Sequence, residues 1–181
     1  MYVYPVDNDS PFFQGDIVDN FPLFLVDISG FNILKQDSKA GSKYVVEKSK
    51  QLPLNDTEDS LLAVETRRQK VIILTQTCDI QQRDTIVFAP VYSISEAISE
   101  GRMSEKQATG LRHRKVDYWF YLPELEGVIE ESYIDFQIMH YIPKDIIMNN
   151  LEKRFLSLSH WGRHHLGWAL SVFFGRPIKQ L

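Results

Sequence analysis

The chain has 181 residues, a formal net charge of −4, 44% hydrophobic residues and a single cysteine. This composition is that of an ordinary globular protein with its own core, and it excludes an intramolecular disulfide and a multi-cysteine zinc site. The acidic balance argues against nucleic-acid binding over the whole surface but leaves room for a local basic patch. No apolar run approaches the roughly 20 residues that span a bilayer, and the start lacks a signal-peptide pattern, so we expect a cytoplasmic protein without membrane contact.

The first 60 residues predict an arm, a strand and a long polar loop. Residues 1–12 are typical of an arm, and residues 14–18 predict the start of a strand in which Gly15 supplies an unusual backbone angle. The apolar run 23–28 continues that strand or forms its partner, and Pro22 marks its start. Residues 35–60 are polar and rich in turn formers, and only residues 44–46 predict a short strand there.

Two continuous apolar runs form the centre of the predicted sheet. Residues 71–74 are β-branched residues and leucine, which predicts a strand buried on both faces. Residues 86–91 predict a second such strand, ended by Pro90. About eleven residues separate the two runs, too many for a tight hairpin, so we expect a structured loop between them.

The second half of the chain mixes helices with strands. Residues 94–98 have helical spacing with Ser93 or Ser95 as the cap, and a second short helix is predicted within 103–115. Residues 118–122 predict an aromatic strand. Residues 133–142 alternate and predict one strand with Ile134, Phe136 and Ile138 on the same face.

Residues 155–175 are the strongest helix prediction, with Ser157 or Ser159 as the cap and Gly175 as the stop. The apolar residues of this segment recur at helical spacing. They are Trp161, His165, Trp168, Ala169, Val172 and Phe173, and the stripe is widened by Leu166, Leu170 and Phe174. So broad an apolar stripe is expected to be buried against the sheet or a second subunit.

Three segments follow one another in an order and spacing known from a family. Gln14-Gly15-Asp16-Ile17-Val18 looks like an R-G-D-I-V opening. Residues 68–76, R-Q-K-V-I-I-L-T-Q, sit where that family has T-R-P-x-V-V-I-S-N, and residues 84–91, D-T-I-V-F-A-P-V, look like a strand ending in V-A-P. Over residues 13–93, about half of its length, the chain therefore resembles the PemK/MazF-like toxins.

The resemblance implies a β-rich α+β fold: a single SH3-like β-barrel over 13–143 with a polar loop insertion at about 35–60 and inserted short helices. A C-terminal helix over 155–175 completes the single domain 1–181. Members of the family are often homodimers and cleave single-stranded RNA with a basic residue and a Ser or Thr, near which Arg68 and Thr75 fall. An endoribonuclease of a toxin–antitoxin or defence system, with RNA and an antitoxin as partners, is implied. Gln69 and Lys70 depart from the family's arginine–proline pair.

The Thr-Cys-Asp segment is not typical of the toxins, and it offers a different chemistry. Cys78 on a strand-end turn is a candidate nucleophile, whereas the alternative is a buried, inert thiol. Asp79 is a candidate acid–base group, whereas the alternative is a turn cap. His160 and His164 have a spacing that can seat a metal, but the H-E-x-x-H signature is absent. We expect no metal and no cofactor.

Two basic runs are candidates for phosphate contacts. The first contains Arg67, Arg68 and Lys70, and the second contains Arg112, His113 and Arg114. The second run directly precedes the aromatic segment 118–121, a combination typical of single-stranded nucleic-acid binders. The alternative is solvated charge beside a core strand. RNA binding or cleavage is thus the leading hypothesis, ahead of a non-enzymatic protein-interaction module and of a cysteine enzyme using Cys78.

Overall fold

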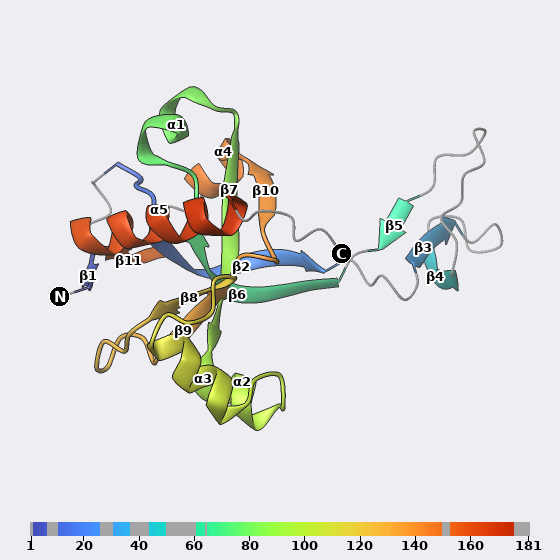
Figure 1. The fold of residues 1–181 in the computed structure, drawn as a ribbon. Helices are drawn as coiled ribbons and strands as arrows, with labels where there is room; N and C mark the ends of the chain where they lie inside the picture. Colours follow the sequence, from blue (N-terminus) through green and yellow to red (C-terminus); the bar gives the residue numbers. More distant parts are fainter. Residues whose placement is uncertain are drawn as a thin grey trace. The chain divides into compact units, whose positions relative to one another are not determined.

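A computed structural model describes residues 2–6, 11–25, 31–36, 44–49, 61–63, 65–149 and 153–175 of the chain (Figure 1). The chain divides into two compact units. The first unit combines Met1–Phe21 with Gln69–Leu181, and the second is Pro22–Arg68. None of the helices in the described residues is both long and apolar enough to cross a membrane.

The main element is an antiparallel eight-stranded sheet with the strand order β1-β11-β2-β6-β7-β9-β8, while β10 also pairs with β7. Its strands are β1 (Val3–Pro5), β2 (Asp16–Leu25), β6 (Glu65–Ile73), β7 (Thr85–Ser93), β8 (Trp119–Leu122), β9 (Ser132–Asp135), β10 (His140–Pro143) and β11 (Arg154–Leu158). Within the described residues this sheet is not closed, because β1 and β8 remain its two ends.

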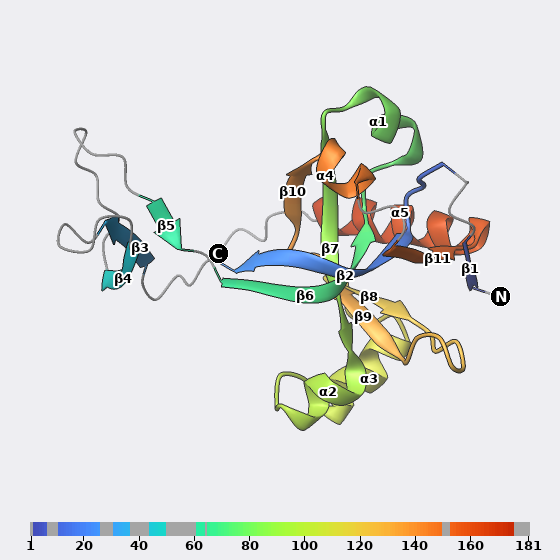
Figure 2. The ribbon, with the colours of Figure 1, turned by 180° about the vertical axis from the view of Figure 1, so that it is seen from behind.

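Five helices are present in the described residues: α1 (Thr77–Gln82), α2 (Ile94–Ser99), α3 (Glu105–Arg112), α4 (Lys144–Met148) and α5 (His160–Phe174). The predicted β-rich α+β class is therefore confirmed. Figures 1 and 2 show the long strand β7 running between α1, which precedes it, and α2, which follows it.

The two apolar runs form neighbouring strands, as predicted. Val71, Ile72 and Ile73 of β6 are fully buried and pair with β7. Pro90 does not end its strand, however, since β7 continues to Ser93. On one side β7 pairs with β10 up to Phe88 and with β9 from Val91. Pro90 lies between these two pairings, so the sheet loses no hydrogen bond there although proline has no N–H. Likewise, Pro22 lies inside β2 and does not start it.

The predicted single strand over 133–142 is wrong. It is divided into β9 and β10, which pair with two successive parts of β7. Between them the carboxylate of Asp135 accepts a hydrogen bond from the N–H of Gln137, and its carbonyl accepts one from the N–H of Ile138. This turn buries Phe136 in the core and leaves Ile138 41% exposed.

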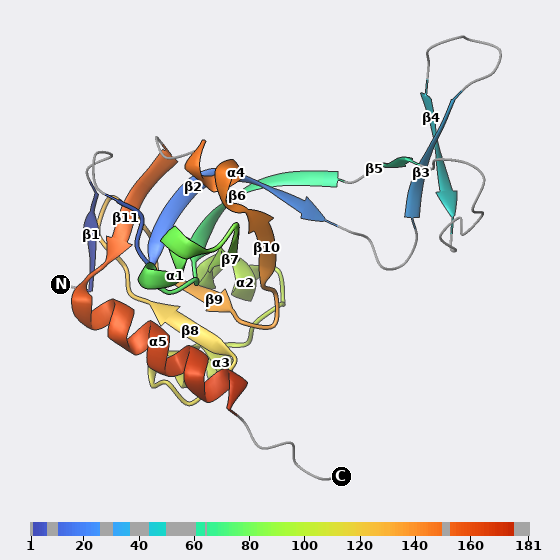
Figure 3. The ribbon, with the colours of Figure 1, turned by 90° about the horizontal axis from the view of Figure 1, so that it is seen from above.

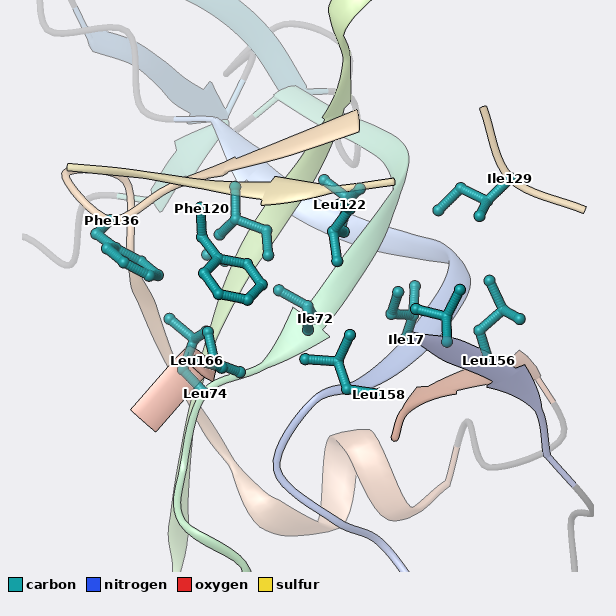
Figure 4. Packing of buried hydrophobic residues seen from close by; sticks show 14 residues of the cluster. Ile17, Ile72, Leu74, Phe120, Leu122, Ile129, Phe136, Leu156, Leu158 and Leu166 are labelled. Carbon is teal, nitrogen blue, oxygen red and sulfur yellow. The ribbon is translucent and has the colours of Figure 1, made fainter. Parts of the chain in front are cut away.

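The hydrophobic core lies between the sheet and α5 (Figure 4). Its members come from segments far apart in the sequence, including Ile72 of β6, Phe120 of β8, Leu156 of β11 and Leu166 of α5. Each such side chain contributes roughly 1.5–3 kcal/mol when fully buried. A second cluster, with Ile94, Ala97 and Leu111, fixes α2 and α3.

The segment 155–175 is not one helix. Residues 154–158 form β11, which pairs with β1 and β2, and α5 begins after Ser159, whose hydroxyl accepts a hydrogen bond from the N–H of Gly162. The predicted stripe is buried only in part: Leu166 is a core residue and Ala169 and Phe173 pack against the core. Trp161 and Trp168 are 70% and 63% exposed, so the edge of the stripe that carries them does not contact the sheet.

The second unit contains a three-stranded antiparallel sheet of order β4-β3-β5, formed by β3 (Phe31–Gln36), β4 (Tyr44–Ser49) and β5 (Leu61–Ala63). The strand predicted at residues 44–46 is confirmed within β4. Most of the predicted polar loop over 35–60, namely residues 37–43 and 50–60, lies outside the described residues.

Candidate functional site

The opening motif Gln14-Gly15-Asp16 is a buried clasp between distant strands. Asp16 is fully buried; its carboxylate lies 3.0 Å from Nη1 of Arg154 and accepts hydrogen bonds from the Ser157 hydroxyl and the Phe13 N–H. Gly15 has φ +87°, and a Cβ there would meet Leu158 at 2.8 Å. The opening motif therefore joins the start of β2 to β11.

Thr75, a predicted catalytic residue, is buried, and its hydroxyl makes a hydrogen bond. Its Oγ1 accepts a hydrogen bond of 2.7 Å from the N–H of Val87. Next to it, the side chain of Gln14 donates to the carbonyl of Leu74 at 2.8 Å. These bonds tie the end of β6 to β7 and to the opening motif.

Cys78 and Asp79 lie in the first turn of α1. The thiol of Cys78 is exposed, which contradicts the alternative of a buried cysteine, and its Sγ lies 3.8 Å from the Asp79 carboxylate. Asp79 in turn pairs with Arg83 at 3.2 Å. Both side chains are thus accessible from solvent and adjacent to each other.

Arg67 and Arg68 belong to the second unit, whereas Thr75, Cys78 and Asp79 belong to the first. The four predicted catalytic residues are therefore divided between the two units. Lys70 lies in the first unit, with its Nζ 4.0 Å from the carboxylate of Asp19.

The three residues of the second basic run have different surroundings. Arg112 makes two charge-assisted hydrogen bonds with Glu131, at 2.7 and 2.5 Å, and the Tyr121 hydroxyl donates to the same carboxylate. The bonds from Arg112 and Tyr121 lower the pKa of Glu131. Arg112 is therefore committed to a carboxylate, while His113 and Arg114 are exposed at the end of α3.

Arg114 occupies a backbone conformation that normally belongs to glycine. Its φ is +55°, its N–H donates to the carbonyl of Leu111, and the N–H of Lys115 donates to that of Gly110. These bonds form the Schellman ending of a helix, in which the left-handed position favours glycine and costs other residues about 1–2 kcal/mol. An arginine at this position is a local strain of the kind that collects at functional sites.

The side chain of Arg114 lies at a hollow that we name the α5 hollow. It encloses about 500 Å³ not filled by protein atoms, including solvent at its mouth. Its walls come from the turn after α3, from β8 and from α5, which run close to one another in Figure 3. The lining residues are Tyr2, Leu111, Arg114, Val116, Asp117, Trp119, Phe120, Tyr121, His165, Trp168, Ala169 and Val172.

Arg114 and His165 meet at this hollow. Nη2 of Arg114 lies 3.3 Å from Nδ1 of His165, and the His165 ring stacks on Tyr2 with 6.0 Å between ring centroids. Burial, followed by the charges of Arg114 and His164, lowers the pKa of His165. Burial raises the pKa of Tyr2 to about 12, against the opposing charge of Arg114.

Sequence reasoning found Arg114 but placed His165 and Trp168 on a buried stripe. Trp168 lines the hollow while remaining 63% exposed. One sequence signal could have drawn attention to α5: residues 160–174 contain three of the five His residues and none of the 24 Asp and Glu residues.

Comparison of the chain with protein-family models, with curated proteins and with solved structures found no match. Within the described ranges, no group of three or more His, Cys, Asp or Glu side chains is arranged to hold a metal ion. The class that the fold defines is a β-rich α+β protein with an open antiparallel sheet, and the α5 hollow is its candidate site.

Proposed function

We propose that this protein binds single-stranded RNA in the α5 hollow. The proposal rests on one observation: an arginine in a glycine-type backbone conformation holds its guanidinium beside His165, at a hollow walled by aromatic rings. A guanidinium donates paired hydrogen bonds to phosphate oxygens, and exposed aromatic rings stack on unpaired bases.

The charges around the hollow fit this ligand despite the net charge of −4. Arg114 and Trp168 are exposed residues of its lining, and Lys115 directly follows Arg114 in the chain. Asp117 also lines the hollow, but an RNA chain crossing it would contact α5, which carries no acidic residue. Local positive charge, not the net charge of the chain, determines whether a phosphate backbone is attracted.

The resemblance to the PemK/MazF-like toxins favours RNA over DNA as the nucleic acid. As part of the same proposal, the open sheet is a derivative of an SH3-like barrel. Cleavage is not part of it. The hydroxyl of Thr75 accepts a structural hydrogen bond, and Arg68 belongs to the other unit.

The test is the binding of fluorescently labelled single-stranded RNA of about ten nucleotides, a length within the range that small single-strand binders cover. Fluorescence anisotropy should show binding at low salt that weakens steeply as salt rises, because phosphate contacts release counterions. No binding at low salt would overturn the proposal.

Arg114→Gly is the decisive variant, because glycine suits the backbone of position 114 better than arginine does. We expect RNA affinity to fall about tenfold and the salt dependence to become shallower, as for one lost phosphate contact. Thermal unfolding should show no loss of stability, so weaker binding would not reflect misfolding. Arg83→Ala serves as the control, because Arg83 is an exposed arginine that directly follows α1 and does not line the hollow; this variant should bind normally.

A further inference from the structure

The contact between Arg114 and His165 determines which nitrogen of the imidazole ring carries the hydrogen. All nitrogens of a guanidinium carry hydrogens and only donate, so Nδ1 of His165 must accept the hydrogen bond from Nη2 of Arg114. The ring is then neutral, with its hydrogen on Nε2. A protonated ring would present an N–H to the guanidinium, and two cationic donors would face each other across 3.3 Å.

An anion between the two groups removes this conflict. Phosphate oxygens accept hydrogen bonds from both a guanidinium and an imidazolium, and their negative charge favours the protonated ring. We propose that Arg114 and His165 form one phosphate-binding subsite, and that His165 takes up a proton when the phosphate binds. This inference rests on the proposed RNA binding and names the part of the ligand that the site recognises.

The groups around His165 favour a neutral imidazole ring in the free protein. Arg114 faces it from the turn after α3, Tyr2 from the N-terminal segment and His164 from α5 itself. Asp117 and Tyr121 line the same hollow. Burial, Arg114 and His164 lower the pKa of His165 below its usual 6.5, whereas a bound phosphate acts in the opposite direction.

The sign of the pH dependence follows. The pKa of His165 is lower in the free protein than in the complex, so RNA affinity is constant at high pH and rises as pH falls through the bound-state pKa. It levels off below the free-state pKa. The gain in RNA affinity is about tenfold for each unit by which the bound-state pKa exceeds the free-state pKa.

The experiment measures the affinity for 5′-hydroxyl RNA from about pH 8 to about pH 5.5, the range in which histidine titrates and the phosphodiester does not. The wild-type protein and His164→Gln should bind more tightly at low pH, by about tenfold for a difference of one unit. His165→Gln should lose that rise, and calorimetry in two buffers of different ionisation enthalpy should show proton uptake only when His165 is present.

The same measurement with 5′-phosphorylated RNA, and with inorganic phosphate as competitor, identifies the phosphate. If affinity for 5′-hydroxyl RNA rises at low pH, the subsite binds an internal phosphodiester. If affinity rises only with 5′-phosphorylated RNA and inorganic phosphate, the subsite binds a terminal or free phosphate. Either result supports the subsite. Binding whose pH dependence is unchanged in His165→Gln would overturn this inference and leave the proposed function standing. Absence of RNA binding at every pH would overturn both.

Discussion

The guanidinium of Arg154 lies 3.0 Å from the carboxylate of Asp16, and both side chains are fully shielded from solvent. The pair connects residues 138 positions apart and joins β2 to β11 next to the bend at Gly15. Arg154 also donates to the carbonyl of Pro11 and lies over the ring of Phe12, 5.1 Å from its centroid. The clasp thereby fixes the segment that precedes β2.

We expect Asp16→Ala to reduce the free energy of unfolding by about 3–5 kcal/mol, because it leaves a buried guanidinium without its carboxylate. Denaturant unfolding measures the change. Asp19→Ala is the control, since Asp19 is half exposed and its carboxylate lies 4.0 Å from Lys70; it should cost less than about 1 kcal/mol. Equal effects of the two variants would contradict the role of the clasp.

Two variants, Gly15→Ala and Gly101→Ala, distinguish the free-energy cost of backbone strain at positive φ from the cost of steric overlap with a neighbour. Both glycines have positive φ, +87° and +72°, but only at Gly15 does a new Cβ meet a neighbour, Leu158 at 2.8 Å. We expect about 1–2 kcal/mol of destabilisation at Gly101 from backbone strain. Gly15→Ala should cost a further 1–3 kcal/mol or so from overpacking. Thermal or denaturant unfolding of the two variants decides, and similar losses would argue against the close contact at Gly15.

Trp168 and Trp161 provide a matched pair on one helix for RNA binding. Both indoles are largely exposed, at 63% and 70%, but only Trp168 lines the α5 hollow. We expect Trp168→Ala to weaken the binding of single-stranded RNA by about 1–3 kcal/mol, the range for one stacked base, while Trp161→Ala binds as the wild type does. Fluorescence anisotropy measures both. A loss shared equally by the two variants would place the RNA along α5 instead of in the hollow.

Two histidines should make the fold sensitive to mild acid. Burial lowers the pKa of His140, whose ring stacks on Phe88 at 5.4 Å, and burial also contributes most to the lowered pKa of His165. Below the ordinary pKa of 6.5 the unfolded chain then binds more protons than the folded one, so the free energy of unfolding falls as pH falls through this range.

The variant His140→Gln/His165→Gln should flatten this dependence, as followed by urea unfolding at several pH values without RNA. His113→Gln, at an exposed position, should retain the wild-type slope. If the double variant lost stability on acidification as steeply as the wild type, other groups would have to account for the effect.

The sequence alone determined the local elements wherever the pattern was continuous or strictly periodic. The apolar run at Ile72 predicted a buried strand, the run at Phe88 predicted its neighbour, and Ser159 was one of two predicted caps for the last helix. Such features depend on backbone preferences and side-chain spacing within a few residues. The strands and helices predicted in this way agree with the β-rich α+β class that the structure has.

Only the tertiary structure decided which surfaces are buried and which side chains meet. The apolar stripe of α5 was visible in the sequence, but β11 and the sheet cover the face with Leu166 and leave Trp168 exposed. Arg114 and His165 are 51 positions apart, and their contact depends on the packing of α3 and α5 around β8. Local patterns cannot specify such pairs, because packing between distant segments determines them.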